Sequence, residues 1–208
     1  MLLKGFFRVQ PFNPTLNKET LLFEKNTSGG YSYTIPAKYK GKSIRIVISG
    51  AGGGMWSGVV NQAAPDIIWY GGNGELYEYQ FSNSNQNIIT GIIGAHGVKS
   101  SSAQEPNGGS GYSNGGTGTI FGDYLYSKGG GGGGSSSLVI DNKFIYEVSA
   151  GGGMNYEKVT GGYGGGPRGG QGGQNAGNGY GAKGAVWRRG APSNTEGEDG
   201  YIRIYVLP

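Results

Sequence analysis

Short strand-like segments in this chain run directly into glycine, and this pattern limits the possible folds more than any other feature. Residues 48–55 read Ile-Ser-Gly-Ala-Gly-Gly-Gly-Met, and residues 148–154 nearly repeat them as Val-Ser-Ala-Gly-Gly-Gly-Met. A weaker third copy, Ile-Ile-Gly-Ala-His-Gly, lies at 92–97. None of the copies has the polar turn residues that normally close a hairpin. Glycine must therefore do more here than make turns.

The glycine content has two familiar explanations, disorder and collagen, and neither fits. Glycine occupies 47 of 208 positions, against about 7% in ordinary proteins. Disordered chains carry few aromatic residues and much charge, whereas this chain has 15 Tyr, 7 Phe and 3 Trp with only 14% charged residues. Collagen needs glycine at every third position and abundant proline, but residues 161–167 break that period and the chain has 8 Pro. We therefore expect ordered glycine segments.

Strand patterns recur between the glycine segments. Tyr31, Tyr33 and Ile35 alternate with polar residues, as in a half-buried strand. The expected strands are 21–25, 31–35, 44–48, 75–81, 87–90, 137–140, 144–148 and 202–206, with a hairpin turn at Asp141-Asn142. No apolar period of 3.6 residues persists, and glycine disfavours helices. The chain is therefore predicted to be mostly β, with sandwich-like strands, irregular glycine-rich segments and almost no α-helix.

The glycine segments themselves predict a packed bundle of polyglycine II helices. Ordering each glycine costs about 1–2 kcal/mol of backbone entropy, so hydrogen bonds between backbones must compensate. Glycine adopts the extended, left-handed threefold conformation and lets neighbouring chains approach to backbone distance. The runs 129–134 and 161–184 suit this arrangement. The alternative, a flexible linker, predicts serine-rich spacers between two domains, whereas glycine here recurs along the chain.

Three motifs carry a resemblance to a known family. They are Tyr-Thr-Ile-Pro-Ala at 33–37, Ile-Arg-Ile-Val-Ile-Ser-Gly-Ala-Gly-Gly-Gly at 44–54 and Gly-Tyr-Ile-Arg-Ile-Tyr at 200–205, with glycine clusters between them. This order resembles the glycine-rich domain of bacteriophage tail and tail-fibre adhesin proteins. The domain would cover residues 21–208, and residues 1–20 would form an N-terminal arm or attachment segment.

The resemblance implies a function without catalysis. In the phage adhesins it implies a polyglycine sandwich whose connecting loops touch the host receptor. The expected protein is a tail-fibre or spike component of a virion; the alternative is a head fibre, spike or decoration protein with a purely structural role. The implied partners are other virion proteins of the fibre, baseplate or capsid, and a host surface glycan or outer-membrane protein. Phage fibres and spikes are commonly trimeric, so the analogy suggests a homotrimer, while the residues themselves do not specify an oligomeric state.

Composition bears on location and on other partners. Residues 1–7 are too short and too interrupted for a signal peptide, and no stretch approaches the ~18 apolar residues that span a bilayer. We therefore expect a protein made in the host cytoplasm and carried on the virion. The net charge of +4 is scattered, and the Arg-Gly-Gly at 168–170 stands alone. Nucleic-acid binding is therefore not expected.

Receptor contacts are expected in the loops that leave the glycine segments. Aromatic residues beside Asn, Ser and Gly are typical of adaptable recognition loops and of carbohydrate stacking. The candidate receptor-binding residues are Met55, Trp56, Trp69, Tyr70, Tyr112, Tyr156, Tyr163, Trp187 and Arg188. For each of them an alternative stays open: the side chain covers an end of the glycine bundle or packs between protomers.

No catalytic site, metal site or cofactor is expected. The chain has no cysteine, and His96 is its only histidine, expected to be structural or at the surface. Glu196, Glu198 and Asp199 lack the spacing of a calcium loop and indicate a solvated turn. Residues 41–43, Gly-Lys-Ser, lack the first glycine of a phosphate-binding loop. No pair of carboxylates suited to glycoside hydrolysis is evident.

Overall fold

The computed structural model describes residues 19–55, 57–58, 68–99, 106–121, 127–155, 160–188 and 196–208. Within these ranges the fold is mostly β with antiparallel sheets, and its helical content is one 3₁₀ turn, η1 (Ala37–Tyr39). The strands are β1 (Thr20–Lys25), β2 (Gly29–Thr34), β3 (Ser43–Ser49), β4 (Ser57–Gly58), β5 (Ile68–Tyr70), β6 (Leu76–Ser82), β7 (Ile88–Ile93), β8 (Ile120–Phe121), β9 (Ser127–Lys128), β10 (Ser136–Ile140), β11 (Lys143–Val148), β12 (Val186–Arg188) and β13 (Tyr201–Val206). The prediction of a mostly β chain is confirmed.

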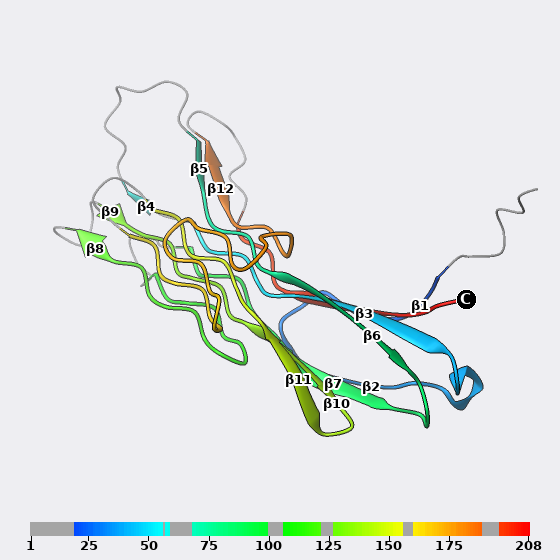
Figure 1. The fold of residues 1–208 in the computed structure, drawn as a ribbon. Helices are drawn as coiled ribbons and strands as arrows, with labels where there is room; N and C mark the ends of the chain where they lie inside the picture. Colours follow the sequence, from blue (N-terminus) through cyan, green and yellow to red (C-terminus); the bar gives the residue numbers. More distant parts are fainter. Residues whose placement is uncertain are drawn as a thin grey trace, which may run out of the picture.

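Two four-stranded antiparallel sheets form a sandwich at one end of the molecule (Figure 1). Sheet A has the order β1-β13-β3-β6, and sheet B has the order β11-β10-β7-β2. Every strand predicted from the sequence overlaps a strand of one of these sheets. The predicted hairpin turn is present, with φ values of 48° at Asp141 and 64° at Asn142, as a type I′ turn requires. β1 begins at Thr20, and residues 1–18 lie outside the described ranges.

The core of the sandwich follows from strand alternation. Sheet A buries Ile44, Ile46, Ile48, Ile202 and Ile204, and sheet B buries Ile89, Ile93 and Leu138. Because side chains alternate between the two faces of a strand, a slip of one residue would turn each set outward. The isoleucine pattern therefore sets the register of the sheets and fixes where each strand ends and its glycine segment begins.

The outer faces of the two sheets differ in charge. Sheet A carries the ion pairs Arg45–Glu19, Arg45–Glu78 and Arg203–Glu24. Sheet B instead exposes large apolar side chains, with exposed fractions of 45% at Ile88, 37% at Ile92 and 49% at Phe144. Tyr112 stacks on Phe144, with 5.6 Å between the ring centroids. An exposed apolar group of this kind commonly marks an interaction surface.

Glycine-rich segments continue from the strands and run side by side away from the sandwich (Figure 1). Backbone hydrogen bonds link run 129–134 to its neighbours with a period of three. Gly131 and Gly134 donate to segment 95–98, Gly130 and Gly133 to segment 151–154, and Gly129 and Gly132 to segment 116–119. The carbonyls of the same run accept hydrogen bonds from three further segments. The donors are the backbone N–H groups of Ala51 and Gly54, of Gly162 and Gly165, and of Gly109. The run is thus bonded to six other stretches of chain.

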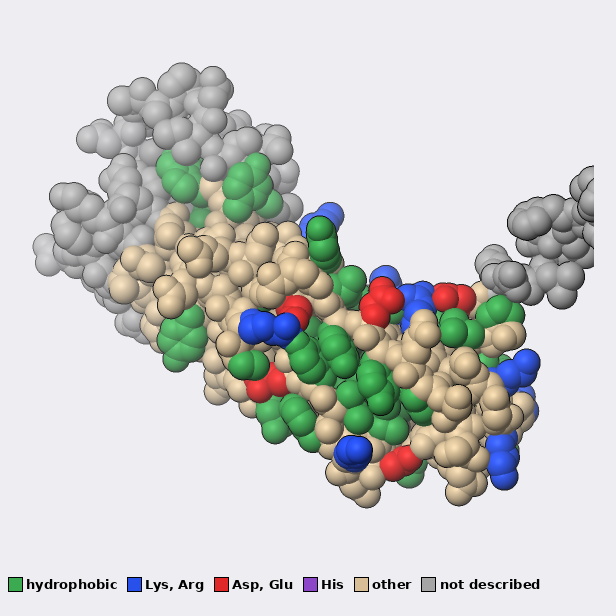
Figure 2. Space-filling model, in the orientation of Figure 1, with side chains coloured by type: hydrophobic (Ala, Val, Ile, Leu, Met, Phe, Trp, Pro, Cys, Tyr) green, Lys and Arg blue, Asp and Glu red, His purple; other side chains and the backbone are tan. Residues whose placement is uncertain are grey.

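The backbones approach so closely that side chains are excluded. A Cβ atom added to Gly53 would lie 1.8 Å from the carbonyl oxygen of Gly152, and one added to Gly72 would lie 1.6 Å from that of Gln174. Real Cβ atoms essentially never come within 3.0 Å of such an atom. Figure 2 accordingly shows the described part of this half as mostly backbone and uncharged polar side chains, while apolar and charged groups gather over the sandwich.

Candidate functional site

A second, small apolar core lies at the distal end, defined here as the end of the glycine segments away from the sandwich (Figure 1). β5 pairs with β12 there, and Trp69 lies opposite Trp187 with 4.8 Å between the ring centroids. Both rings pack on Met55, Met154 and Ala185, which are almost fully buried. Met55 and Met154 are the last residues of the two glycine repeats. Each repeat therefore runs from the sandwich core to this distal core.

The packing of this core bears on three of the predicted receptor contacts. The side chain of Met55 is 1% exposed, so the prediction that it lies on an exposed recognition loop is wrong. Burial is favoured because the thioether fills the space between the glycine segments and the two indole rings. Trp69 and Trp187 are partly buried against the same cluster. This packing fits the alternative that the sequence left open, in which a side chain covers an end of the glycine bundle.

The exposed tyrosines among the candidates do not form one site. Tyr70, Tyr112 and Tyr163 are 55%, 51% and 61% exposed. Tyr70 ends β5 at the distal end, whereas Tyr112 stacks on sheet B at the sandwich end. The ring of Tyr163 lies on a flank, where it would block a side chain at Gly116. Trp56, Tyr156 and the side chain of Arg188 lie outside the described residues.

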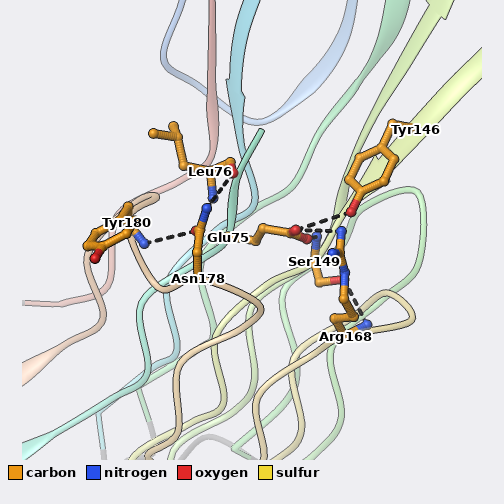
Figure 3. A network of polar contacts seen from close by, with 7 residues as sticks. All are labelled: Glu75, Leu76, Tyr146, Ser149, Arg168, Asn178 and Tyr180. Atoms are coloured by element: carbon orange, nitrogen blue, oxygen red, sulfur yellow. Dashed lines mark hydrogen bonds and ion pairs between the residues drawn. The ribbon is translucent and has the colours of Figure 1, made fainter. Parts of the chain in front are cut away.

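A buried carboxylate that the sequence did not reveal joins the sandwich to the glycine segments (Figure 3). Glu75 is 4% exposed, and its Oε2 accepts a hydrogen bond from the Ser149 backbone N–H at 3.1 Å. Its Oε1 pairs with Arg168 at 2.5 Å and accepts a bond from the Tyr146 hydroxyl at 3.2 Å. The Arg168 guanidinium also lies over the Tyr146 ring. A charge so buried is stable only when paired in this way.

The backbone of Glu75 takes part in the same junction. Its N–H donates to the carbonyl of Ser149 at 2.9 Å, and its carbonyl accepts a bond from the Gly50 N–H at 3.1 Å. The Ser149 hydroxyl in turn accepts the Arg168 backbone N–H at 2.9 Å. Because these contacts join chain segments far apart in sequence, Glu75 fixes how the glycine segments leave the sandwich.

A second carboxylate, Asp199, ties three further segments together. Its Oδ1 accepts the His96 backbone N–H at 2.9 Å and lies 2.7 Å from His96 Nδ1, and its Oδ2 accepts the Ser28 N–H at 2.9 Å. The hydrogen bond to Asp199 raises the pKa of His96, although burial opposes this. Burial alone would raise the pKa of Asp199, but the bonds from His96 and Ser28 outweigh it and lower that pKa. Within the described ranges no group of three His, Asp or Glu side chains could hold a metal ion.

The His96–Asp199 pair predicts a specific pH dependence of stability. Because folding raises the pKa of His96, its contribution is complete below about pH 6.5 and is lost as pH rises through the folded pKa. Asp199 acts oppositely: its contribution is complete above about pH 4 and lost only in stronger acid. His96 is 36% exposed, so we expect His96→Gln to lower the melting temperature by only about 1–3 °C near pH 6.

The measurement is calorimetry of both proteins from pH 5 to 9. The difference in melting temperature should shrink as pH rises, since His96 is the only histidine in the chain. A difference that stays constant or grows with pH would show that protonation of His96 does not stabilise the fold.

No family model and no curated protein matched the chain. Within the described residues, no helix has the length and apolar character needed to cross a membrane.

Proposed function

We propose that the glycine-rich half is a bundle of polyglycine II helices. A left-handed extended helix has three residues per turn and no internal hydrogen bonds, so its amides must bond to neighbours. The bonds of run 129–134 return to the same neighbour at every third residue, and none of its glycines has a positive φ. These two features support polyglycine II. A flexible linker would instead leave such amides to water.

We propose further that the protein is a non-enzymatic component of a phage virion, a tail-fibre or spike protein that binds a host cell-surface receptor from its distal end. The observation that carries this proposal is a frame of glycine segments, hydrogen-bonded to one another, that ends in an aromatic core. The frame holds Tyr70 exposed beside the partly buried Trp69–Trp187 pair. A pre-organised support of this kind lowers the entropy cost of binding.

Binding without a chemical step is the proposed mode of action. The carboxylates that the described residues hold most firmly, Glu75 and Asp199, accept hydrogen bonds from backbone N–H groups and pair with a cation or an imidazole. Groups committed in this way serve the fold. Recognition by shape and stacking of a host surface glycan or an outer-membrane protein fits the exposed tyrosines better.

The proposal is tested by competition on cells. Dye-labelled purified protein is expected to bind host cells saturably, and excess unlabelled protein should reduce adsorption of the phage, counted as free plaque-forming particles. The variant Glu24→Gln, on the charged face of sheet A, is the matched control and should bind like the wild type. A folded protein that neither binds the cells nor competes with the phage would contradict the receptor role.

The second candidate is a head fibre or decoration protein, and the apolar outer face of sheet B favours it. Ile88, Ile92, Phe144 and Tyr112 are all at least 37% exposed there, and packing against another virion protein or within a homotrimer would cover them. Antibody-gold labelling of intact particles separates the two candidates. Label at the distal tips of the tail supports the receptor role, and label spread over the capsid supports the structural role.

A further inference from the structure

We infer that a groove beside Tyr70 binds a saccharide. The groove has a volume of about 540 Å³ and runs beside the glycine segments from the end of β5 towards the sandwich, between segment 173–175 and segment 183–186. This volume falls in the range of small-ligand sites in proteins, about 300–1,000 Å³. The inference rests on the proposed receptor role and names the chemical class of the ligand.

The walls of the groove are fixed by the glycine frame. Gly71 donates its N–H to the Ala185 carbonyl at 2.8 Å, which joins the two sides. The Asn73 side chain is held at both ends, because its Oδ1 accepts the Gly184 N–H at 2.9 Å and its Nδ2 donates to the Gly179 carbonyl at 3.2 Å. A site built on such fixed groups needs no ordering when a ligand arrives.

Three side chains that line the groove remain available to a ligand. The Tyr70 ring is 55% exposed. The Asn175 Oδ1 accepts the Asn73 N–H at 2.8 Å, which orients its amide nitrogen. Within the described ranges neither that nitrogen nor the Lys183 ammonium has a hydrogen-bond or ion-pair partner. The groove thus offers an aromatic face, amide N–H donors and an ammonium donor.

This set of groups matches the chemistry of a sugar ring. A hexose has C–H groups on one face, which stack on an aromatic ring, and hydroxyls at its edge, which accept hydrogen bonds from amide and ammonium groups. A nucleic acid is disfavoured, because Lys183 is the single cationic side chain of the lining and the Glu198 carboxylate binds its backbone N–H.

The test is saturation-transfer NMR of the protein with methyl glycosides of glucose, galactose, mannose and N-acetylglucosamine, each titrated to about 20 mM. At least one glycoside should bind saturably, and Tyr70→Ala should weaken that binding about tenfold. Lys183→Met, which keeps the side-chain stem, should weaken it less. The matched control is Tyr163→Ala, which removes a tyrosine of similar exposure, 61%, outside the groove, and it should leave binding unchanged.

Each outcome of these measurements either supports or contradicts the saccharide site. Absence of saturable binding by all four glycosides, or equal losses in Tyr70→Ala and Tyr163→Ala, would overturn the groove as a saccharide site. Unchanged melting temperatures of the variants exclude unfolding as the cause of a loss. Host-cell binding by the wild type is measured in parallel. If the wild type binds host cells but none of the glycosides, the saccharide site is wrong and the receptor role stands. If it binds a glycoside through Tyr70 but does not bind cells, the receptor role is wrong and the saccharide site stands.

Discussion

Replacing Gly72 by alanine is expected to lower the free energy of unfolding by at least about 3 kcal/mol. The new methyl group would lie 1.6 Å from the Gln174 carbonyl oxygen and 2.3 Å from its carbon. Both are backbone atoms, so no side chain can rotate away. Segments 71–74 and 170–176 would have to separate, which would break the hydrogen bond from the Ala176 N–H to the Asn73 carbonyl. The melting temperature should fall by about 6–12 °C.

The matched control is Gly30→Ala in β2. The atom nearest to a Cβ at Gly30 is a carbonyl oxygen at 4.0 Å, and its φ is not positive. Alanine there should leave stability unchanged or raise it by up to about 1 kcal/mol, because it reduces the freedom of the unfolded chain. Urea unfolding followed by tyrosine and tryptophan fluorescence measures both variants. Similar small effects in the two would mean that the glycine segments are not closely packed.

Replacing Glu75 by alanine should have the next largest effect, a loss of about 3 kcal/mol. The substitution leaves the Ser149 N–H and the Tyr146 hydroxyl without their carboxylate acceptor and opens a cavity. Arg168 is 50% exposed, so its charge regains water and adds little to the loss. The cost comes from the buried donors at the junction of sandwich and glycine segments.

An exposed ion pair provides the comparison for Glu75. Glu24→Gln removes the partner of Arg203, whose side chain is 43% exposed, and should cost less than about 1 kcal/mol. Both variants are measured by urea unfolding at pH 7. If Glu75→Ala costs no more than Glu24→Gln, the buried network does not hold the two halves of the molecule together.

The sandwich was predictable from the sequence, while the pairing of β5 with β12 at the distal end was not. Period-two alternation and isoleucine-rich runs mark the eight long strands locally, and Asp141-Asn142 marks the hairpin. β5 and β12 have only three residues each, and their pairing depends on contact between distant parts of the chain. Which glycine segment lies beside which was also unpredictable, because glycine has no side chain that specifies a neighbour.

The candidate site was predictable only in part, for a related reason. Residue type alone favoured exposure of Tyr70 and Tyr163, and both are exposed. The prediction for Met55 is wrong because Met55 ends a glycine repeat and packs in a core, as Met154 does at the end of the second repeat. The methionine at the end of both repeats was the feature of the sequence that could have indicated a core shared by the two repeats. The networks around Glu75 and Asp199 left no local signal, since their partners lie far along the chain.

Amide hydrogen exchange of the glycine segments, followed residue by residue by NMR, tests most directly whether they form a rigid frame. Each amide of run 129–134 donates to another segment, so all six should exchange slowly and at rates close to those of β3 and β13. Slow exchange should also repeat at 51–54 and 151–154, whose amides bond to neighbouring segments. Exchange of run 129–134 at the rate of an unstructured peptide, with the sandwich still protected, would contradict a polyglycine frame.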